Sequence, residues 1–262
     1  MGQAKTRLAR TQEAHPFCCF CGGTVATETI EHAPPKVFFL KKQRLKGLEF
    51  PACARCNNGS SQLDQVAAFV AISMAGILDY DNESPYWKKL ATGVRNNTPE
   101  VVKYMGVPGS HHLLRVKGRL REVVRIKLDP RLLQDFIHPW AAKQMYALWY
   151  AHAGFALGKD ARVFVRLYTN DKIIQSGVPD EVMKDLGLPQ TLTQGKLEAS
   201  GQYFYRIAIR ADLNIAKIVL GLHDSSIIVG IIFPEEARDK FTSPFRAGEL
   251  FRTSPDTGIV PV

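Results

Sequence analysis

The sequence has no apolar run of the roughly 18 residues or more that a membrane-spanning helix needs. A long apolar run toward its C-terminal end covers only residues 227 to 233. Residues 1 to 14 also lack the apolar segment of a secretory signal peptide. We therefore expect a cytoplasmic protein that does not associate with membranes. A reducing cytoplasm disfavours disulfide bonds.

Several common catalytic signatures are missing as well. The sequence has no Walker loop, no dinucleotide-binding glycine fingerprint, no serine-nucleophile elbow and no solenoid-like repeat. Acidic residues are also fewer than basic ones, with 25 Asp and Glu against 34 Lys and Arg and a net charge of +9. This excess favours a nucleic-acid phosphate backbone over an acidic protein as the partner.

Cysteine is scarce, but its placement is regular. Four of the five cysteines form two Cys-x-x-Cys pairs, Cys18 with Cys21 and Cys53 with Cys56. Two such pairs supply the four thiolates of a closed tetrahedral Zn²⁺ site, which leaves no position for water and is therefore structural. Two disulfides or buried free thiols are the alternatives. Cys19 could compete as a ligand, but Cys18 has the right spacing to Cys21 and we expect Cys19 to pack in the interior.

The residues around these pairs predict short elements. Gly22 and Gly23 suit a turn with positive φ after the second cysteine. A short strand is expected over residues 29 to 32, and Pro34 and Pro35 end it because proline cannot donate to a sheet ladder. Residues 62 to 79 carry the apolar spacing of a helix.

The order of these features resembles the HNH endonucleases of the ββα-metal fold. The shared pattern is Cys-x-x-Cys, an acidic residue and His at a strand end, and Cys-x-x-Cys-Asn entering a helix; phage endonuclease VII shares that ending. A group of prokaryotic HNH proteins is more similar still. The matching positions are Cys18, residues 21 to 23, Glu31, His32, residues 34 to 36 and residues 51 to 59. The resemblance is strong over about residues 15 to 70.

The resemblance implies roles for particular residues. His32 would be the general base, and Glu31 and Asn57 would hold one catalytic Mg²⁺ or Mn²⁺. Glu31 stands where many members have Asp. Many members also have an Asn about five residues before the third cysteine, but this chain has residues 47 to 49 there, Gly-Leu-Glu, so the loop-supporting role is unassigned. Asn58 and Asp64 are reserve candidates for the metal shell.

Two clusters of basic residues are candidates for DNA contacts, mainly with the backbone. The first lies in the loop beside the proposed site and comprises Lys41, Lys42, Arg44 and Lys46. The second is expected on one face of a single strand and comprises Arg115, Lys117, Arg119 and Arg121, with Arg125 and Lys127 extending that face across a hairpin. A solvated sheet face explains the second cluster equally well.

We predict an α+β protein in three parts: an N-terminal arm over residues 1–14, a zinc-stabilised ββα-metal (HNH) module over residues 15–80, and an α+β domain with a mainly antiparallel sheet over residues 81–262. In the last part we expect a helix over residues 140 to 153 with Pro139 in its first turn, a strand over 163 to 168, a short helix near 180 to 186 and a three-stranded meander over 202 to 233.

The expected function is that of a metal-dependent HNH endonuclease that nicks or cuts DNA, in phage defence or mobile-element biology. A non-catalytic zinc-dependent DNA-binding or adaptor protein and an RNA-directed nuclease or toxin are the alternatives. Control by an activating ligand or partner protein is also expected, because an unregulated nuclease would damage its host. A homo-oligomer is a further expectation, because cutting both strands with one active site per chain favours a dimer.

Overall fold

The computed structural model of the chain describes residues 3–40, 48–75, 85–105, 111–116, 119–124, 128–191, 193–194, 197–199, 201–240, 249–254, 256 and 258–262. Helices and antiparallel strands both contribute, which confirms a mixed α+β protein. Among the described residues, no helix combines the length and the apolar character needed to cross a bilayer.

The N-terminal elements frame the two cysteine pairs. They are α1 (Gln3–Ala14), β1 (Thr29–His32), η1 (Lys36–Phe38), β2 (Glu49–Ala52), α2 (Ala54–Asn58) and α3 (Ser61–Ala75). β1 and β2 form an antiparallel pair in which Thr29 lies opposite Ala52 and His32 opposite Glu49. The strand predicted at residues 29 to 32 and the helix predicted from residue 62 are therefore present, although the described helix ends at Ala75.

A second group of elements leads to the long central helix. It comprises α4 (Pro85–Asn97), α5 (Pro99–Met105), β3 (His111–Val116), β4 (Arg119–Val124), α6 (Pro130–Leu132), the π-helical turn η3 (Leu133–Ile137) and α7 (His138–Ala153). Pro139 lies in the first turn of α7, as predicted. Gly154 ends the helix with a φ of 81°, a left-handed conformation that glycine adopts without strain.

The remaining elements build the large sheet, the helices over its outer face and a separate two-stranded pair, β7 and β8. They are β5 (Ala161–Tyr168), α8 (Asn170–Ser176), α9 (Asp180–Met183), β6 (Gln190–Thr191), β7 (Thr193–Gln194), β8 (Leu197–Glu198), β9 (Tyr203–Arg210), η4 (Ala211–Leu213), β10 (Ile215–Leu222), β11 (Ser226–Pro234), η5 (Glu235–Lys240), β12 (Leu250–Ser254) and β13 (Gly258–Pro261). The predicted meander is β9, β10 and β11, joined by antiparallel pairing.

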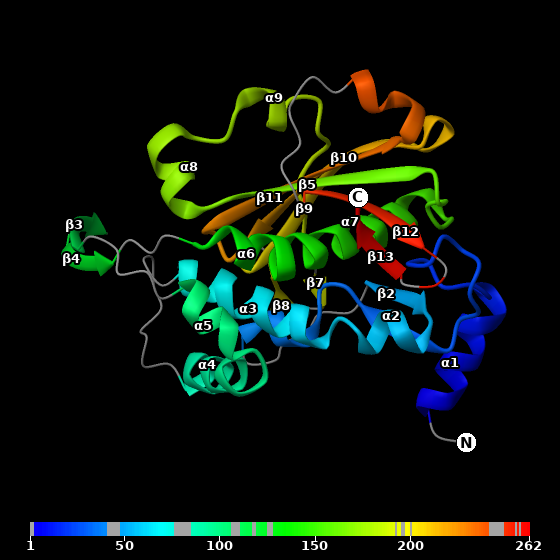
Figure 1. Ribbon diagram of the computed structural model, residues 1–262, viewed down its shortest axis with the longest axis horizontal. Helices are drawn as coiled ribbons and strands as arrows, with labels where there is room; N and C mark the ends of the chain where they lie inside the picture. Colours follow the sequence, from blue (N-terminus) through cyan, green and yellow to red (C-terminus); the bar gives the residue numbers. More distant parts are fainter. Residues whose placement is uncertain are drawn as a thin grey trace.

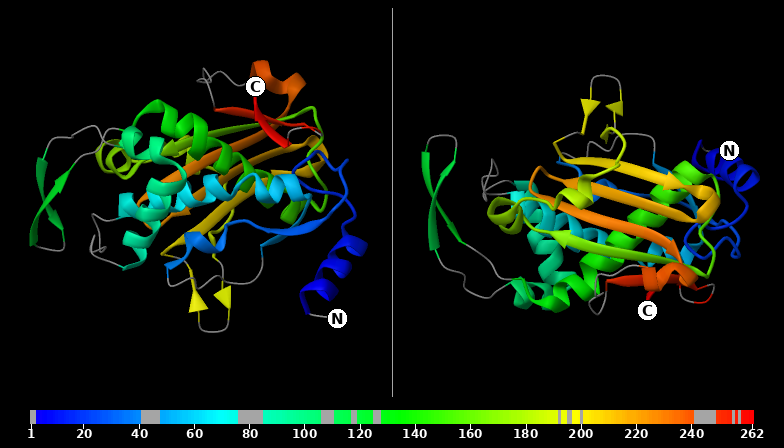
Figure 2. Two further views of the ribbon diagram at one scale, coloured as in Figure 1. Left: turned by 60° about the horizontal axis from the view of Figure 1, so that its bottom comes forward. Right: turned by 90° about the horizontal axis from the view of Figure 1, so that it is seen from above.

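The seven-stranded sheet has the order β13-β12-β5-β11-β10-β9-β6, and its described pairings are antiparallel. α7 crosses one face of this sheet, and α8 and α9 lie over the other (Figures 1 and 2). Because successive side chains of a strand point to opposite faces, the sheet packs against helices on both sides. Val219 and Val229, which are paired, pack with Leu186 on the side of α8 and α9.

α7 lies between the sheet and the N-terminal elements (Figure 1). Its Trp140, Met145 and Trp149 are fully buried, as the sequence predicted for Trp140 and Trp149. The ring of Phe38, from η1, stacks on Trp140 with centroids 5.5 Å apart and an interplanar angle of 11°. One continuous cluster of buried residues therefore includes the cysteine segment, α3, α7 and the sheet, and it crosses the predicted boundary near residue 80.

The second basic cluster does not lie on one strand. β3 ends at Val116 and β4 begins at Arg119, and these two residues pair across an antiparallel hairpin. Arg115 pairs with Leu120 and Leu114 with Arg121. The prediction of a single strand from residue 115 to 121 is therefore wrong, and the alternation that would have placed its basic residues on one face does not apply. Lys117, Arg125 and Lys127 lie outside the described residues.

Candidate metal centre and adjoining polar cluster

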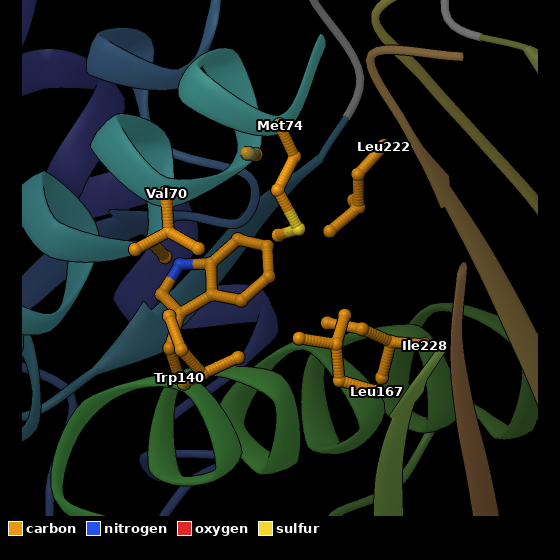
Figure 3. A pocket seen from close by; sticks show the side chains of 9 residues that line it. Val70, Met74, Trp140, Leu167, Leu222 and Ile228 are labelled. Atoms are coloured by element: carbon orange, nitrogen blue, oxygen red, sulfur yellow. The ribbon is translucent and has the colours of Figure 1, made fainter. Parts of the chain in front are cut away.

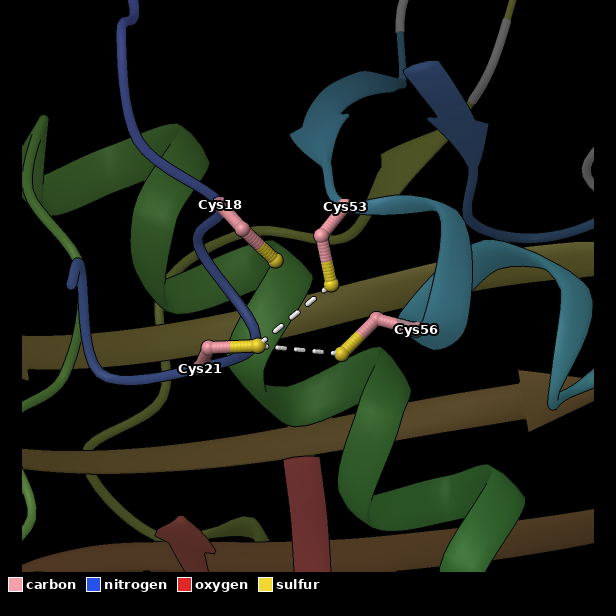
Figure 4. Close-up of side chains that lie close together, drawn as sticks. All are labelled: Cys18, Cys21, Cys53 and Cys56. Atoms are coloured by element: carbon pink, nitrogen blue, oxygen red, sulfur yellow. Dashed lines mark hydrogen bonds between the residues drawn. The ribbon is translucent and has the colours of Figure 1, made fainter. Parts of the chain in front are cut away.

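The two cysteine pairs come together as predicted. The Sγ atoms of Cys18, Cys21, Cys53 and Cys56 all lie within 4.8 Å of one another (Figure 4). Cys21 Sγ is 3.6 Å from Cys53 Sγ and 3.3 Å from Cys56 Sγ. Zn–S bonds of about 2.3 Å in a tetrahedron place sulfur atoms about 3.8 Å apart. The cluster therefore fits a four-thiolate metal site, and zinc is the ion that such a set of ligands favours.

Local backbone geometry explains why the cysteines converge. Gly22 and Gly23 both have a φ of +72°, as expected for the turn after Cys21. Cys53 caps the N-terminus of α2, and Cys56 lies one turn further along that helix. The backbone N–H of Phe20 donates to Cys18 Sγ at 3.4 Å, a contact that stabilises a thiolate.

The C-terminal strands also reach the cysteine cluster. Arg55 donates to Cys21 Sγ at 3.6 Å and to the backbone carbonyl of Asp256. A Cβ atom on Gly258 would lie only 3.1 Å from Cys56 Sγ, and this glycine has a φ of +77°. The backbone at the start of β13 thus approaches Cys56 too closely for a larger residue to fit without strain.

Hydrogen bonds among the thiols set their protonation. Donation from Cys21 and Cys56 lowers the pKa of Cys18. The same hydrogen bonds, with burial, raise the pKa of Cys21 to about 12 and raise that of Cys56. A bound divalent ion would stabilise the cysteine side chains as thiolates.

Cys19 is not part of this group. It is fully buried, its backbone N–H donates to the Pro51 carbonyl at 3.0 Å, and burial raises the pKa of its thiol. These features agree with the prediction that Cys19 packs in the interior.

β1 directs the two residues proposed for catalysis to different surroundings. Glu31 is 4% exposed, whereas its neighbours Ile30 and His32 are only half-buried, as the alternation of a strand requires. The His32 side chain is 30% exposed, and its Nε2 lies 3.3 Å from Glu49 Oε1 on β2. Glu49 also forms an ion pair with Arg7 of α1.

The Glu31 carboxylate faces a lysine that the sequence analysis did not consider. Lys143 Nζ, from α7, lies 3.0 Å from Glu31 Oε2 and 3.1 Å from the Cys56 carbonyl, and it also donates to Ser60 Oγ. Burial raises the pKa of Glu31, and the Lys143 ammonium opposes that rise. The one available signal was a lysine between Trp140 and Ala147, at helical spacing on the apolar side of α7.

The reserve candidate Asp64 belongs to the same buried cluster. Ser60 Oγ lies 3.5 Å from Asp64 Oδ2. Burial raises the pKa of Asp64 to about 7, with Lys143 opposing that change. The Lys143 ammonium therefore lies 3.0 Å from the Glu31 carboxylate and also opposes the rise in the pKa of Asp64 through its charge. Asn58, the other reserve candidate, ends α2 and makes no contact in this cluster among those described.

Asn57 is held against β1. Its Nδ2 donates to Thr29 Oγ1 and, at 3.5 Å, to the Ile30 carbonyl. Glu31 Oε2 lies 3.0 Å from Lys143 Nζ, and Asn57 donates through Nδ2, so the atoms through which the two residues would hold a divalent ion are Glu31 Oε1 and Asn57 Oδ1.

The predicted DNA-contact residues are only partly described. Lys41, Lys42, Arg44, Lys46 and Lys117 lie outside the described residues. Arg115 belongs to β3, and Arg119 and Arg121 belong to β4.

A small cavity lies elsewhere, between α3, α7 and the sheet, and is lined by Val70, Met74, Trp140, Leu167, Leu222, Ile228 and other apolar side chains (Figure 3). It has no acid, base or metal ligand in its lining, so it is part of the core rather than a reaction site.

Comparison with protein-family models, with curated proteins and with solved structures finds no match.

Proposed function

We propose that the protein is a metal-dependent HNH endonuclease that hydrolyses phosphodiester bonds in DNA, by nicking or by double-strand cleavage, in the cytoplasm. The observation that carries the proposal is the position of His32. It ends a strand of the β1–β2 pair, α2 follows that pair with two of the clustered cysteines, and its side chain is 30% exposed. Water and a phosphate group can therefore reach it.

The chemistry of His32 fits this role. An imidazole is the side chain best suited to accept a proton from water near neutral pH. Asn57 connects α2 to β1 through Thr29 and Ile30, so strand and helix form one unit around the cysteines. This compact ββα arrangement is what the resemblance to HNH endonucleases implies.

The charge of the molecule supports a nucleic-acid substrate. The net charge is +9. α1 also carries exposed Lys5, Arg7 and Arg10, and Arg7 lies beside the residue that contacts His32. Such residues attract phosphates without selecting a sequence. We propose contacts with the DNA backbone as the main mode of DNA binding.

The same proposal includes a role in phage defence or mobile-element biology. It also includes a homo-oligomer and control by a ligand or partner protein.

A second candidate is a zinc-dependent protein that binds DNA, or serves as an adaptor, without cutting it. The buried pair of Glu31 and Lys143 favours it, because the carboxylate expected to bind the catalytic ion already has a cation 3.0 Å away. The two candidates differ in one outcome, cleavage that depends on His32.

Supercoiled plasmid incubated with zinc-loaded protein in Mg²⁺ or Mn²⁺ separates them. The nuclease should give nicked or linear DNA, and EDTA or His32→Ala should abolish the product. His152→Ala is a matched control, since His152 lies at the end of α7 and contacts Tyr205 instead. Unchanged cleavage by His32→Ala would exclude the HNH mechanism. DNA binding without cleavage would favour the second candidate, and cleavage of RNA alone would indicate an RNA-directed nuclease.

A further inference from the structure

The C-terminal strand pair, β12 and β13, reaches both cysteine pairs. In the turn after Cys21, a Cβ atom on Gly22 would lie 3.3 Å from Thr253 Oγ1 of β12. At the second cysteine pair, a Cβ atom on Gly258, which begins β13, would lie 3.1 Å from Cys56 Sγ. Glycine at these two positions therefore lets the cysteine segments pack closely against strands from the other end of the chain.

Arg55 connects the same parts of the chain through its guanidinium group. Its Nη2 donates to Cys21 Sγ at 3.6 Å, and its Nη1 donates to the backbone carbonyl of Asp256, between β12 and β13. Arg55 lies on α2 and is adjacent in sequence to Cys56. One side chain beside the second cysteine pair thus contacts a thiol of the first pair and the backbone of the C-terminal hairpin.

The charge of Arg55 complements that of a loaded metal centre. Four thiolates exceed the charge of one Zn²⁺ ion, so the centre would be negatively charged. A guanidinium is always protonated, and its N–H groups have a fixed planar geometry. Donation to Cys21 Sγ therefore stabilises the thiolate that binds the metal, and donation to Asp256 holds the hairpin against the centre. The Arg55 side chain is exposed, so salt screens part of this interaction.

The hairpin is held by the large sheet at one end. β13 is the last strand in the sheet order and pairs with β12 from Phe251 opposite Pro261 to Ser254 opposite Gly258. Among the described residues, β12 pairs with β5 at Leu250 and Phe251. The contacts with the cysteine segments lie toward the opposite end of the hairpin, where Ser254 pairs with Gly258.

We propose that Arg55 is a positioning residue of the metal centre and couples the bound metal to the β12–β13 hairpin. Retention of the metal then depends on the C-terminal strands, although all four cysteines belong to the N-terminal part of the chain. In return, the metal centre stabilises an edge of the large sheet as well as the N-terminal elements.

The rate of zinc release to a colorimetric chelator tests the role of Arg55. Arg55→Gln should release zinc about tenfold to a hundredfold faster than the wild type, the range seen when a partner of a metal ligand is lost. Arg55→Lys keeps the charge, so its rate should lie closer to that of the wild type. Arg95→Gln removes an exposed arginine of α4 and is the matched control. Equal release by Arg55→Gln and the wild type, or a wild type that binds no zinc, would overturn the proposal.

A pair of glycine variants tests the contribution of β13. Gly258→Ala should also release zinc faster, because its methyl group would press on Cys56 Sγ. Gly154→Ala is the matched control, since this glycine has a similar φ of 81° but a Cβ atom there would meet nothing within 4 Å. Equal zinc release by the two variants would show that the contact between β13 and Cys56 does not affect the metal.

Hydrogen exchange tests the coupling in the other direction. In zinc-loaded Arg55→Gln, amide exchange should become faster in β12 and β13 and stay at the wild-type rate in β10 and β11, which lie within the sheet. Unchanged exchange in β12 and β13 would overturn the coupling. These measurements use the full chain without DNA, so their outcome does not depend on whether the protein is a nuclease.

Discussion

Lys143 places its ammonium 3.0 Å from the Glu31 carboxylate, and each side chain is only 5% exposed. The pair joins the central helix α7 to strand β1, and the same ammonium contacts the Cys56 carbonyl. Burying both charges costs free energy that the contacts between them must offset. The intact pair is therefore expected to contribute little net stability, whereas removing one partner should destabilise the protein strongly.

Lys143→Met should destabilise the protein by about 3 to 5 kcal/mol, because the carboxylate of Glu31 would remain buried without its cation. The double variant with Glu31→Gln should recover much of this loss, since no charge is then stranded. Urea unfolding of the two single variants and the double variant gives the interaction free energy directly. Single variants that each cost less than about 1 kcal/mol, the range of exposed pairs, would contradict the buried pairing.

Removal of the ammonium should also change metal binding. If Glu31 is a ligand of a catalytic divalent ion, Lys143 competes with that ion for the carboxylate, so Lys143→Gln should bind Mn²⁺ more tightly than the wild type. Adding Glu31→Gln to this variant should abolish the gain. Electron paramagnetic resonance of free Mn²⁺ during titration of the zinc-loaded proteins measures both affinities. Equal Mn²⁺ affinity in all of these proteins would exclude Glu31 as a ligand.

The cysteine cluster should hold one zinc ion per chain, and chelation should unfold the N-terminal elements. Structural zinc contributes about 10 to 16 kcal/mol to folding in small zinc-binding peptides, more than most domains have in reserve. Cys56→Ser should lose the metal and the cooperative unfolding transition, whereas Cys19→Ala should keep the full zinc content. Elemental analysis and circular dichroism provide the two measurements. Loss of zinc in Cys19→Ala with retention in a Cys18 variant would show that the ligand is misassigned.

His223 should make the protein less stable in acid. Burial lowers the pKa of His223 to about 4, although its contact with the Phe38 carbonyl, 3.0 Å away, opposes the change. Because the folded pKa lies below the ordinary value of about 6.5, the unfolded chain binds the extra proton first. This contribution to stability is complete above about pH 6.5 and is lost as the pH falls toward 4, amounting to about 3 kcal/mol.

Urea unfolding at pH 7.5 and at pH 4.5 measures this loss. His223→Gln keeps an amide that can donate to the Phe38 carbonyl but has no titrating group, so its stability should fall less over the same interval. Carboxyl groups that titrate in both proteins cancel in the comparison. Identical pH dependence of the wild type and the variant would show that His223 is not the responsible group.

The elements that were predicted correctly have local causes. Apolar alternation and turn residues identify β9, β10 and β11, and Pro139 with its apolar face identifies α7. The cysteine cluster was predictable because two-residue spacing within each pair fixes its chemistry. The hairpin of β3 and β4 was misplaced because the alternation of basic residues outweighed the turn signal of Gly118, which lies between Val116 and Arg119.

The surroundings of the site depend on contacts that no local pattern contains. Lys143 is 87 residues from Cys56 in sequence, and its importance comes only from packing α7 against β1 and α2. Glu49 meets His32 through the register of a strand pair, and Arg7 reaches it from a helix that was expected to be an arm. The resemblance in sequence therefore predicts the residues for catalysis, whereas the residues that contact them can be identified only from the fold.

The stacking of Phe38 on Trp140 has a consequence for how this protein could have been assembled. A nuclease module that moves between unrelated chains has to carry its own interior. Here an aromatic ring from the segment between the two cysteine pairs completes the interior against the central helix, and a fragment ending near residue 80 would leave that ring without cover. Exchanging either this segment or the central helix and sheet for that of another protein would therefore disrupt the packing of both.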